Sequence, residues 1–138
     1  MNEKINTEKA PEPVGSYPHA RRVGNLLFLS GVGPRKPGTK VIPGVMVDGQ
    51  GNAVGHDIET QCYSVFENVK IILEASGSRW ENLVDVTVFL TNMQRDFDTY
   101  NRIYAEYFKD NQPCRTTVEI SALPTPIAIE LKCIATIE

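Results

Sequence analysis

The sequence predicts an α+β fold in which one mixed β-sheet carries two helices on one of its faces. Residues 84–90 alternate apolar side chains with the period of a strand, whereas residues 58–73 and 97–108 place theirs at helical spacing. The predicted order is strand, strand, short strand, helix, strand, helix, strand, strand, without a repeat or a dividing linker. We therefore expect a single domain over residues 1–138, in which about residues 1–9 form a polar tail with the composition of a mobile segment.

The first elements are a predicted hairpin and a long region of loops. The stretch PHARRVGNLLFLSG reads as two short strands around Gly24 and Asn25, because this pair can adopt the positive φ angles of a two-residue hairpin turn. Residues 32–55 are rich in glycine and proline, which predicts mobile loops. Within them, GVMV is expected to form a short edge strand.

Two helices and three strands are predicted for the rest of the chain. Asp57 is placed to cap the first helix and Gly77 to end it, and a stripe of aromatic residues predicts a second helix from about Phe97. Two final strands flank SALPTP. Apolar residues occur on both faces of the strands at 84–90 and 127–137, so we expect the helix-free face to be buried in a ring of identical subunits.

Composition and charge exclude several classes of function. The chain of 138 residues has 41% hydrophobic and 22% charged residues, which suits one compact core. Its net charge of -3 and its lack of a basic stripe make nucleic acid an unexpected partner. The polar N-terminal residues contain no apolar run, so we expect neither a signal sequence nor a membrane anchor, and a cytoplasmic location.

Cysteine and histidine usage argues against metal and cofactor chemistry. Three scattered cysteines do not form a disulfide framework and are typical of a reducing compartment. The two histidines lack neighbouring CxxC, HxxxH or acidic clusters, and neither GxGxxG nor a P-loop is present. We therefore expect no metal and no cofactor, so that side chains and water carry any chemistry.

One arginine and one glutamate stand among the apolar and β-branched residues of the last two strands. The expected hairpin pairs Ile120 with Ile127. Thr117 then lies opposite Glu130, and Arg115 is diagonal to that glutamate on the same face. One interpretation is an exposed ion pair, which contributes at most about 1 kcal/mol. The other is a site in which the guanidinium binds the carboxylate of a planar imino or keto acid while the glutamate orients a water.

Other candidate site residues have two interpretations each. Asn101 lies on the apolar stripe of the second helix, where a lone amide needs a partner in a ligand site or in the backbone. Tyr17 is a lid over the core or part of a cleft, and Ser30 is a turn residue or a ligand contact. Cys114 is interpreted as a small core residue rather than an activated thiolate, since no histidine base is near it in sequence.

The chain resembles the reactive intermediate/imine deaminase family, also called RidA or YjgF, from about Ala10 onward. The resemblance is carried, in the family's order, by VGSYPHARRVGNLLFLSG, ENVKIILEASGS, LVDVTVFLTNM, YNRIYAEYF and PCRTTVEISALP followed by IAIELKCIA. It implies a chorismate-mutase-like fold and a homotrimer with a site in each cleft between subunits. It also implies cofactor-free hydrolysis of an enamine or imine carboxylic acid, with release of ammonia.

The same resemblance implies roles for single residues. Arg115 matches the carboxylate-binding arginine, and Glu130 matches the acidic residue that positions the hydrolytic water. Other residues that line the cleft are matched by Tyr17, Ser30 and Asn101. Thr117 departs from the pattern, because many members have a cysteine two residues after the arginine, and a thiol-dependent role is therefore in doubt.

A narrower likeness, to 2-aminomuconate deaminases, is carried by YPHARR, PRKPGTKVIPGVMVDGQGN and RTTVEISALPTPIAIELKCIA. A dicarboxylate substrate requires a second cation or donor, for which Arg35 and His19 are the candidates, although Arg35 is also interpretable as a solvated loop charge. The alternatives are a general scavenger of 2-aminoacrylate-type imines, a small-acid-binding protein, and an RNA-acting endoribonuclease or translation inhibitor. The acidic charge balance disfavours the last of these.

Overall fold

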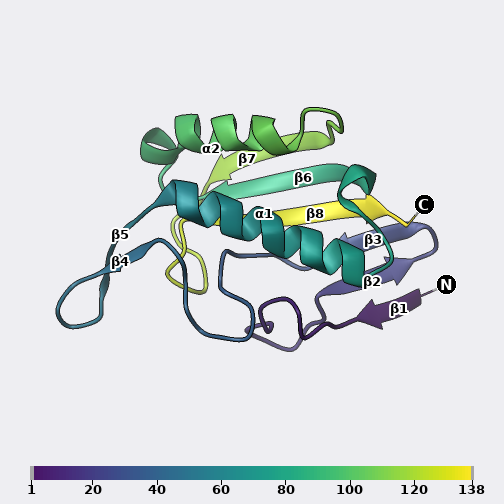
Figure 1. Cartoon of the computed structure of the whole chain (residues 1–138), viewed down its shortest axis with the longest axis horizontal. Coiled ribbons are helices and arrows are strands. Elements are labelled where there is room, and N and C mark those ends of the chain that lie inside the picture. Colours follow the sequence, from purple (N-terminus) through teal and green to yellow (C-terminus); the bar gives the residue numbers. More distant parts are fainter. Residues whose placement is uncertain (1, 138) are drawn as a thin grey trace.

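Two helices lie across the same face of a six-stranded mixed sheet in the computed structural model, which describes residues 2–137 (Figure 1). The strand order is β1-β2-β3-β8-β6-β7. The strands of this sheet are β1 (Asn2–Ile5), β2 (Ala20–Val23), β3 (Leu26–Leu29), β6 (Leu83–Leu90), β7 (Cys114–Glu119) and β8 (Ile129–Thr136). The helices are α1 (Ile58–Ala75) and α2 (Met93–Tyr107), with a short 3-10 helix at Trp80–Asn82. The predicted α+β class is confirmed.

The predicted hairpin at the start of the sheet is confirmed. The polar tail before it, which was expected to be a mobile segment, instead contains a strand. β2 and β3 pair antiparallel around Gly24, which has a φ of 61°. β1 adds to β2 as a further antiparallel strand, with Asn2 opposite Val23 and Ile5 opposite Ala20. The polar sequence of β1 is compatible with a strand because β1 lies at the edge of the sheet, beside solvent.

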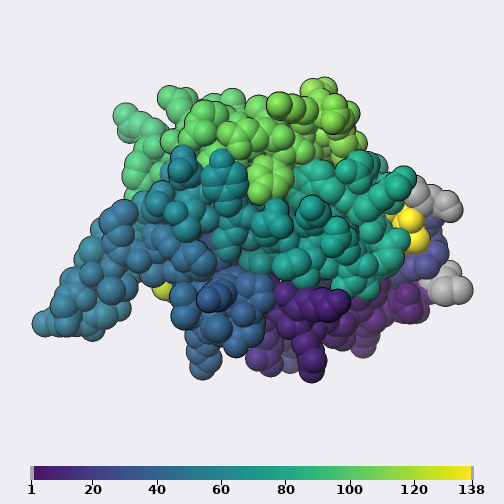
Figure 2. Space-filling view, in the orientation of Figure 1, coloured from purple at the N-terminus to yellow at the C-terminus, as the bar shows by residue number. Residues whose placement is uncertain are grey.

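The region of loops contains a second, separate hairpin. β4 (Val45–Val47) pairs only with β5 (Ala53–His56), so the predicted short strand exists but is not an edge of the main sheet. The hairpin projects from the body of the molecule, as Figures 1 and 2 show. Several of its apolar side chains are exposed, including Met46 and Val54.

The first helix is confirmed with both of its predicted ends. Asp57 is the N-cap residue of α1, and its side chain accepts a hydrogen bond of 2.7 Å from the hydroxyl of Thr60. Gly77 follows the C-cap with a φ of 79°, and the Ser78 N–H donates back to the Leu73 carbonyl at 2.9 Å. A glycine with positive φ is the usual residue at this position, because it carries no Cβ.

The second helix begins four residues earlier than predicted, at Met93 rather than Phe97. Asn92 caps it, with its side-chain oxygen accepting a hydrogen bond of 3.0 Å from the Arg95 N–H. The Glu119 carboxylate at the end of β7 also accepts a 2.7 Å bond from the Met93 N–H. Two polar side chains therefore extend the helix beyond its aromatic stripe and fix its start against β7.

The predicted hairpin between the last two strands is wrong, because β6 lies between them. β6 pairs parallel with β7 and antiparallel with β8, which places Arg115 beside Val86 and Glu130 beside Phe89. Val86 faces the buried helix side, whereas Phe89 has the opposite strand parity. Arg115 and Glu130 therefore emerge on opposite faces of the sheet.

The reason for this arrangement is the strand-helix-strand unit formed by β6, α2 and β7. A helix between two neighbouring strands brings the second strand back parallel to the first. The loop over residues 120–128 must then carry the chain past β6 to β8, which pairs with β3 as well as β6. The intrachain ion pair between Arg115 and Glu130 that was one interpretation of the sequence is therefore not formed.

The core fills the space between the helices and the sheet. Its fully buried side chains include Val65, Phe66 and Val69 of α1 and Leu29, Val88 and Leu131 of the sheet. The ring of Phe66 lies 4.7 Å from that of Tyr107 and 6.1 Å from that of Tyr104, both on α2. Each such side chain contributes about 1.5–3 kcal/mol when buried, so this layer holds α2 over β6 and β7.

The face of the sheet without helices carries a mixture of side chains. Phe89, Thr87, Lys132 and Ile134 are all half-buried on it in the isolated chain. The predicted burial of this face in a homotrimer stays a prediction. Within residues 2–137, neither helix combines the length and the apolar character that crossing a membrane requires.

Candidate functional site

The predicted site residues lie in two groups on different parts of the fold. We call the first the arginine cluster and the second the glutamate pocket. The arginine cluster consists of Asn101, Arg115 and Thr117 with the rings of Tyr100 and Tyr104. The glutamate pocket is lined by Tyr17, His19, Ser30, Gly31, Arg35 and Glu130, among others.

The guanidinium of Arg115 is held by two rings and one amide. Its central carbon lies 4.7 Å from the ring centroid of Tyr104 and 5.4 Å from that of Tyr100. One terminal nitrogen donates to the side-chain oxygen of Asn101 at 2.8 Å. Both Asn101 and Arg115 are exposed, so the partner of this amide is the arginine and not the backbone of a buried helix.

Beneath the arginine, Tyr100 and Thr117 join α2 to β7. The two hydroxyl oxygens lie 2.8 Å apart, and Tyr100 has no exposed surface. Burial raises the pKa of Tyr100, while the hydrogen bond with Thr117 and the charge of Arg115 oppose that rise. The phenol is therefore neutral at physiological pH and serves as a hydrogen-bonding group.

The arginine cluster has the chemistry of an anion site. The ion pairs found in residues 2–137 involve other arginines, Arg95 and Arg102, and none involves Arg115. An exposed guanidinium that uses one of its N–H groups to bond Asn101 keeps its other N–H groups for a ligand. Because its fork matches the two oxygens of a carboxylate, this cluster can bind a small organic acid in one orientation.

The glutamate pocket is a cavity of about 150 Å³ enclosed mainly by loops. Glu130 is half-buried in its wall, and burial raises the pKa of this carboxyl group. A Cβ atom added at Gly31 would lie 2.6 Å from a carboxylate oxygen of Glu130. Only a movement of the far end of the glutamate side chain could relieve this clash. Glycine at this position therefore allows the carboxylate to lie where it does.

Two other predicted residues shape the wall of the pocket. The Ser30 hydroxyl donates to the Pro18 carbonyl at 2.7 Å, which fixes the strand end to the loop before β2. The Tyr17 hydroxyl accepts a 3.3 Å bond from the Val14 N–H, and 42% of this residue is exposed. Tyr17 is therefore a rim residue and not a lid sealed over the core.

His19 is buried, and the backbone engages both of its ring nitrogens. Nδ1 accepts from the Thr7 N–H at 3.2 Å, so Nε2 carries the proton and donates to the Pro11 carbonyl at 2.7 Å. This tautomer holds the segment before β2 in place. It leaves no ring nitrogen of His19 for the carboxylate of a ligand.

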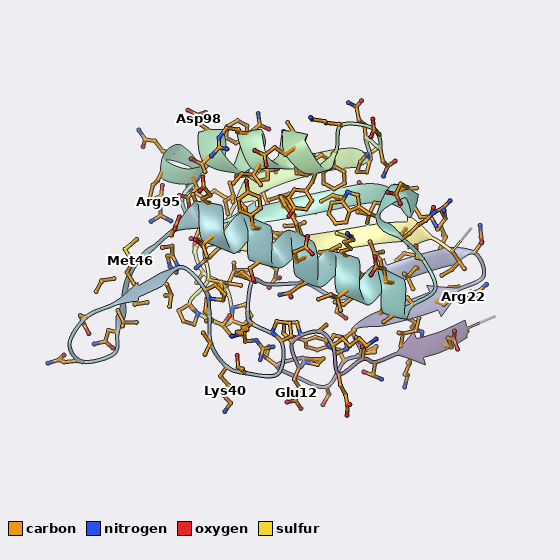
Figure 3. The ribbon with its side chains drawn as sticks, viewed as in Figure 1. Glu12, Arg22, Lys40, Met46, Arg95 and Asp98 are labelled. Atoms are coloured by element: carbon orange, nitrogen blue, oxygen red, sulfur yellow. The ribbon has the colours of Figure 1, made fainter. Side chains whose placement is uncertain are left out.

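Arg35, the other candidate for a second carboxylate, also lines the glutamate pocket. Its guanidinium donates to the Glu12 carbonyl, and its own carbonyl accepts a 2.8 Å bond from the buried side chain of Asn68 on α1. Figure 3 shows Glu12 at the edge of the molecule opposite Asp98 of α2, which illustrates how far the pocket loops lie from that helix.

The three cysteines are free thiols, and none is among the residues that make up the two groups. Cys114 is exposed on β7, so its interpretation as a small core residue is wrong. Cys62 and Cys133 are buried, and burial raises the pKa of each thiol to about 12, which keeps both unreactive. Within residues 2–137, no group of three His, Cys, Asp or Glu residues could hold a metal ion.

Sequence reasoning missed three residues that define these sites. Tyr100 and Tyr104 were assigned only to an apolar stripe, although their spacing of four on one helix face also suits a platform for a cation. Gly31 carried the weaker signal of a glycine two residues after the end of a strand. In each case the deciding partner lies on another element.

Comparison with known proteins covers almost all of the chain. The sequence profile of the family described as Endoribonuclease L-PSP matches residues 7–137. A RutC family protein of Pyrococcus horikoshii is 42% identical over 135 residues, which span 98% of each chain. The chloroplastic Reactive Intermediate Deaminase A of Arabidopsis thaliana is 39% identical over 98% of this chain and 66% of its own length. The crystal structure of E. coli TdcF with bound serine has a TM-score of 0.82 and 31% identity, covering 97% of this chain and 98% of that one.

Proposed function

Because this chain belongs to the Endoribonuclease L-PSP family, also known as Rid, YjgF or RutC, we propose that it hydrolyses an enamine or imine carboxylic acid and releases ammonia. The relative named Reactive Intermediate Deaminase A supports the reaction class. The relative solved with serine supports a small amino acid or a related acid as the ligand class.

One observation carries the proposal for how the site is assembled. Among residues 2–137, Arg115 has donors but no acid partner and the half-buried carboxylate of Glu130 has no cation partner, and the two lie on opposite faces of one sheet. A single chain therefore cannot bring Arg115 and Glu130 into contact with the same small substrate. Two copies can, if the arginine cluster of one faces the glutamate pocket of the next, and a homotrimer would form three such sites.

The reaction then needs only orientation and proton transfer. Arg115 binds the carboxylate next to the C=N carbon, and Glu130 accepts a proton from the water that adds to this carbon. The raised pKa of Glu130 suits the return of this proton to the nitrogen, which gives the carbinolamine. Transfer of the carbinol hydroxyl proton to the same nitrogen then lets the C–N bond break, so that the 2-oxo acid and ammonia leave. An enamine substrate first tautomerises to the imine. Tyr17 and Ser30 position the substrate, and no cofactor is required by this sequence of steps.

For the substrate we propose 2-aminomuconate, a dicarboxylate. Arg35 lines the same pocket as Glu130, which supports it as the group that binds the second carboxylate. His19 is a poor candidate for this role because both of its ring nitrogens are bonded to the backbone. Turnover of 2-aminomuconate that is unchanged in Arg35→Ala would contradict this assignment and favour a general scavenger of 2-aminoacrylate-type imines.

The experiment that tests the proposal measures ammonia release from freshly generated 2-aminomuconate and, separately, from 2-aminoacrylate. Wild type is compared with Arg115→Ala and with Arg21→Ala, a control on β2. Release that depends on Arg115 but not on Arg21 supports a deaminase. Release from neither substrate would favour a small-acid-binding protein, and salt-sensitive cleavage of RNA would favour the endoribonuclease activity for which the family is named.

A further inference from the structure

The side chain of Gln61, in the first turn of α1, is fully buried and bonds in two directions. Its oxygen accepts a hydrogen bond of 2.8 Å from the Ala128 N–H, and its nitrogen lies 3.1 Å from Nδ1 of His56. His56 is the last residue of β5, and Ala128 directly precedes β8. Gln61 therefore joins the base of the projecting hairpin to the loop over residues 120–128.

The loop that Gln61 holds forms one wall of the glutamate pocket. Ala128 is two residues before Glu130 and has no exposed surface. Without the oxygen of Gln61, its N–H would therefore lose its acceptor at a place that water does not reach. Three other residues of this loop line the pocket: Pro124, Thr125 and Ile127. The position of the loop thus bears on where the carboxylate of Glu130 lies.

His56 is fixed in turn by the packing of the hairpin base on α1. Gly44 precedes β4 with a φ of 75°, and its carbonyl accepts a 2.6 Å bond from the Asp57 N–H. A Cβ atom added at Gly44 would lie 2.8 Å from the Asp57 carbonyl and 3.2 Å from side-chain atoms of Thr60 and Gln61. The hairpin base therefore lies directly on the first turn of α1, where β5 leads into the helix (Figure 1).

The protonation state of His56 follows from its partners. The Ala128 N–H can only donate, so the oxygen of the Gln61 amide must face it. The NH₂ group of Gln61 also only donates, and Nδ1 of His56 must therefore be an unprotonated acceptor. A second proton on His56 would set two donors against each other. Turning the amide would move the same conflict to Ala128.

The surroundings of His56 favour its neutral form. Burial lowers the pKa of His56, and the charge of Arg95 lowers it further, whereas the charge of Asp96 raises it. These two residues belong to the first turn of α2 and bond to each other twice at 2.7 Å (Figure 3 labels Arg95). The neighbouring Asp57 carboxylate is bonded to Thr60. Neither β4 nor the loop over residues 120–128 carries a titratable side chain.

We propose that Gln61 is a positioning residue for Glu130, and that a second proton on His56 releases its hold on the loop over residues 120–128. The effect on activity rests on the proposed function, whereas the effect on the loop does not. Because the pKa of His56 is lower in the folded protein, its contribution is complete above about pH 6.5. This contribution is lost as the pH falls through the pKa of the folded state.

The test follows His56 by NMR in the full-length protein, which has one other histidine. A pH titration gives the pKa of the ring and the state of Nδ1, and the Ala128 amide signal reports on the loop. His56→Asn places an acceptor near the position of Nδ1 that does not titrate, and Gln61→Glu replaces the donor by a carboxylate oxygen. Gln112→Glu, an exposed residue beyond the end of α2, is the control for added charge.

We expect Nδ1 of the wild type to be unprotonated at about pH 7.5, with a pKa below the ordinary value of about 6.5. The Ala128 amide should titrate with the same pKa and lose this step in His56→Asn. Gln61→Glu should raise the pKa of His56 above about 7, because a carboxylate oxygen beside Nδ1 favours a proton there. Gln112→Glu should leave it unchanged.

Activity provides the second readout. Glu130 titrates in every variant, so the comparison between variants isolates the effect of His56. The fall in kcat between about pH 7.5 and about pH 5.5 should be about threefold smaller in His56→Asn than in the wild type. An equal fall in both would overturn the role assigned to Gln61 in positioning Glu130.

Three NMR results would each overturn the proposal. They are a protonated Nδ1 at neutral pH, an Ala128 amide that does not follow His56, and a pKa of His56 that Gln61→Glu fails to raise. The expected NMR pattern in a protein that releases no ammonia would instead contradict the proposed deaminase reaction, and it would support the hold of Gln61 on the loop.

Discussion

The arginine cluster and the glutamate pocket are built in different ways. Arg115 stands on a strand and is held by side chains of a helix that a layer of aromatic residues fixes in place. Glu130 also stands on a strand, but loops enclose it and a missing side chain at Gly31 gives it space. In the proposed reaction, recognition of the acid by Arg115 would therefore depend on packing, whereas handling of water by Glu130 would depend on free space beside that carboxylate.

The largest effect is expected when Arg115 is removed from one copy of the chain and Glu130 from another. Arg115→Ala and Glu130→Gln should each lower kcat/KM by about 10²-fold or more, because a charge-assisted clamp or a general base is lost. Coexpression of both variants with different tags, followed by isolation of mixed oligomers, should restore about a third of wild-type activity. This follows because every mixed trimer, whichever variant it holds twice, has one site in three that contains both residues. Mixed oligomers without recovered activity would show that the site is not shared between copies.

The next effect is expected at the space beside Glu130. Gly31→Ala should lower kcat by about tenfold while KM and Tm change little, because the new methyl group displaces only the end of the glutamate side chain. Gly49→Ala is the control, since an added Cβ there meets nothing within 4 Å. Steady-state kinetics, which measures kcat and KM separately, checks this prediction. A rise in KM with an unchanged kcat would instead assign this region to binding.

A smaller effect is expected from the amide beside Arg115. Asn101→Ala should raise KM about threefold to tenfold, because the guanidinium loses the acceptor that fixes its orientation. Asp98→Ala, an exposed substitution on the same helix, is the control. If Asn101→Ala lowers kcat and leaves KM unchanged, Asn101 acts on the reacting atoms and not through the arginine.

The smallest effect concerns stability and pH. Burial raises the pKa of Glu130, so the folded protein binds a proton more readily than the unfolded chain, and this group favours folding less as pH rises above the ordinary carboxyl range. Glu130→Gln should therefore raise Tm slightly at pH 7, with the difference vanishing near pH 4. Thermal unfolding across this range is the measurement. A lower Tm at pH 7 would mean that the charged form has a stabilising partner.

The elements of the fold could be predicted because their periodicity is local. The spacing of Val65, Phe66 and Val69 defines α1 without knowledge of any other segment. The start of α2 could not be predicted from its aromatic stripe, because Asn92 and Glu119 extend the helix through polar contacts. β1 was missed for a related reason, since an edge strand needs no apolar face.

The pairing of strands was the harder problem. Two strands separated by a short proline-containing segment resemble a hairpin, and that reading placed Arg115 and Glu130 side by side. The sequence also contained a signal for the observed pairing, since the order strand, helix, strand of β6, α2 and β7 is typical of parallel neighbours. The residues proposed for the candidate site could therefore be named from the sequence, but their division between two faces of the sheet required the topology.

The position of β8 in the sheet bears on how the protein is made. β8 joins β3 to β6, so it connects a half formed by β1, β2 and β3 with a half formed by β6 and β7. It also follows the other five strands of this sheet along the chain. We expect the nascent chain to carry two unjoined halves until β8 has been made, so a ribosome-bound chain that stops before Ile129 should be digested by protease far faster than one that includes β8.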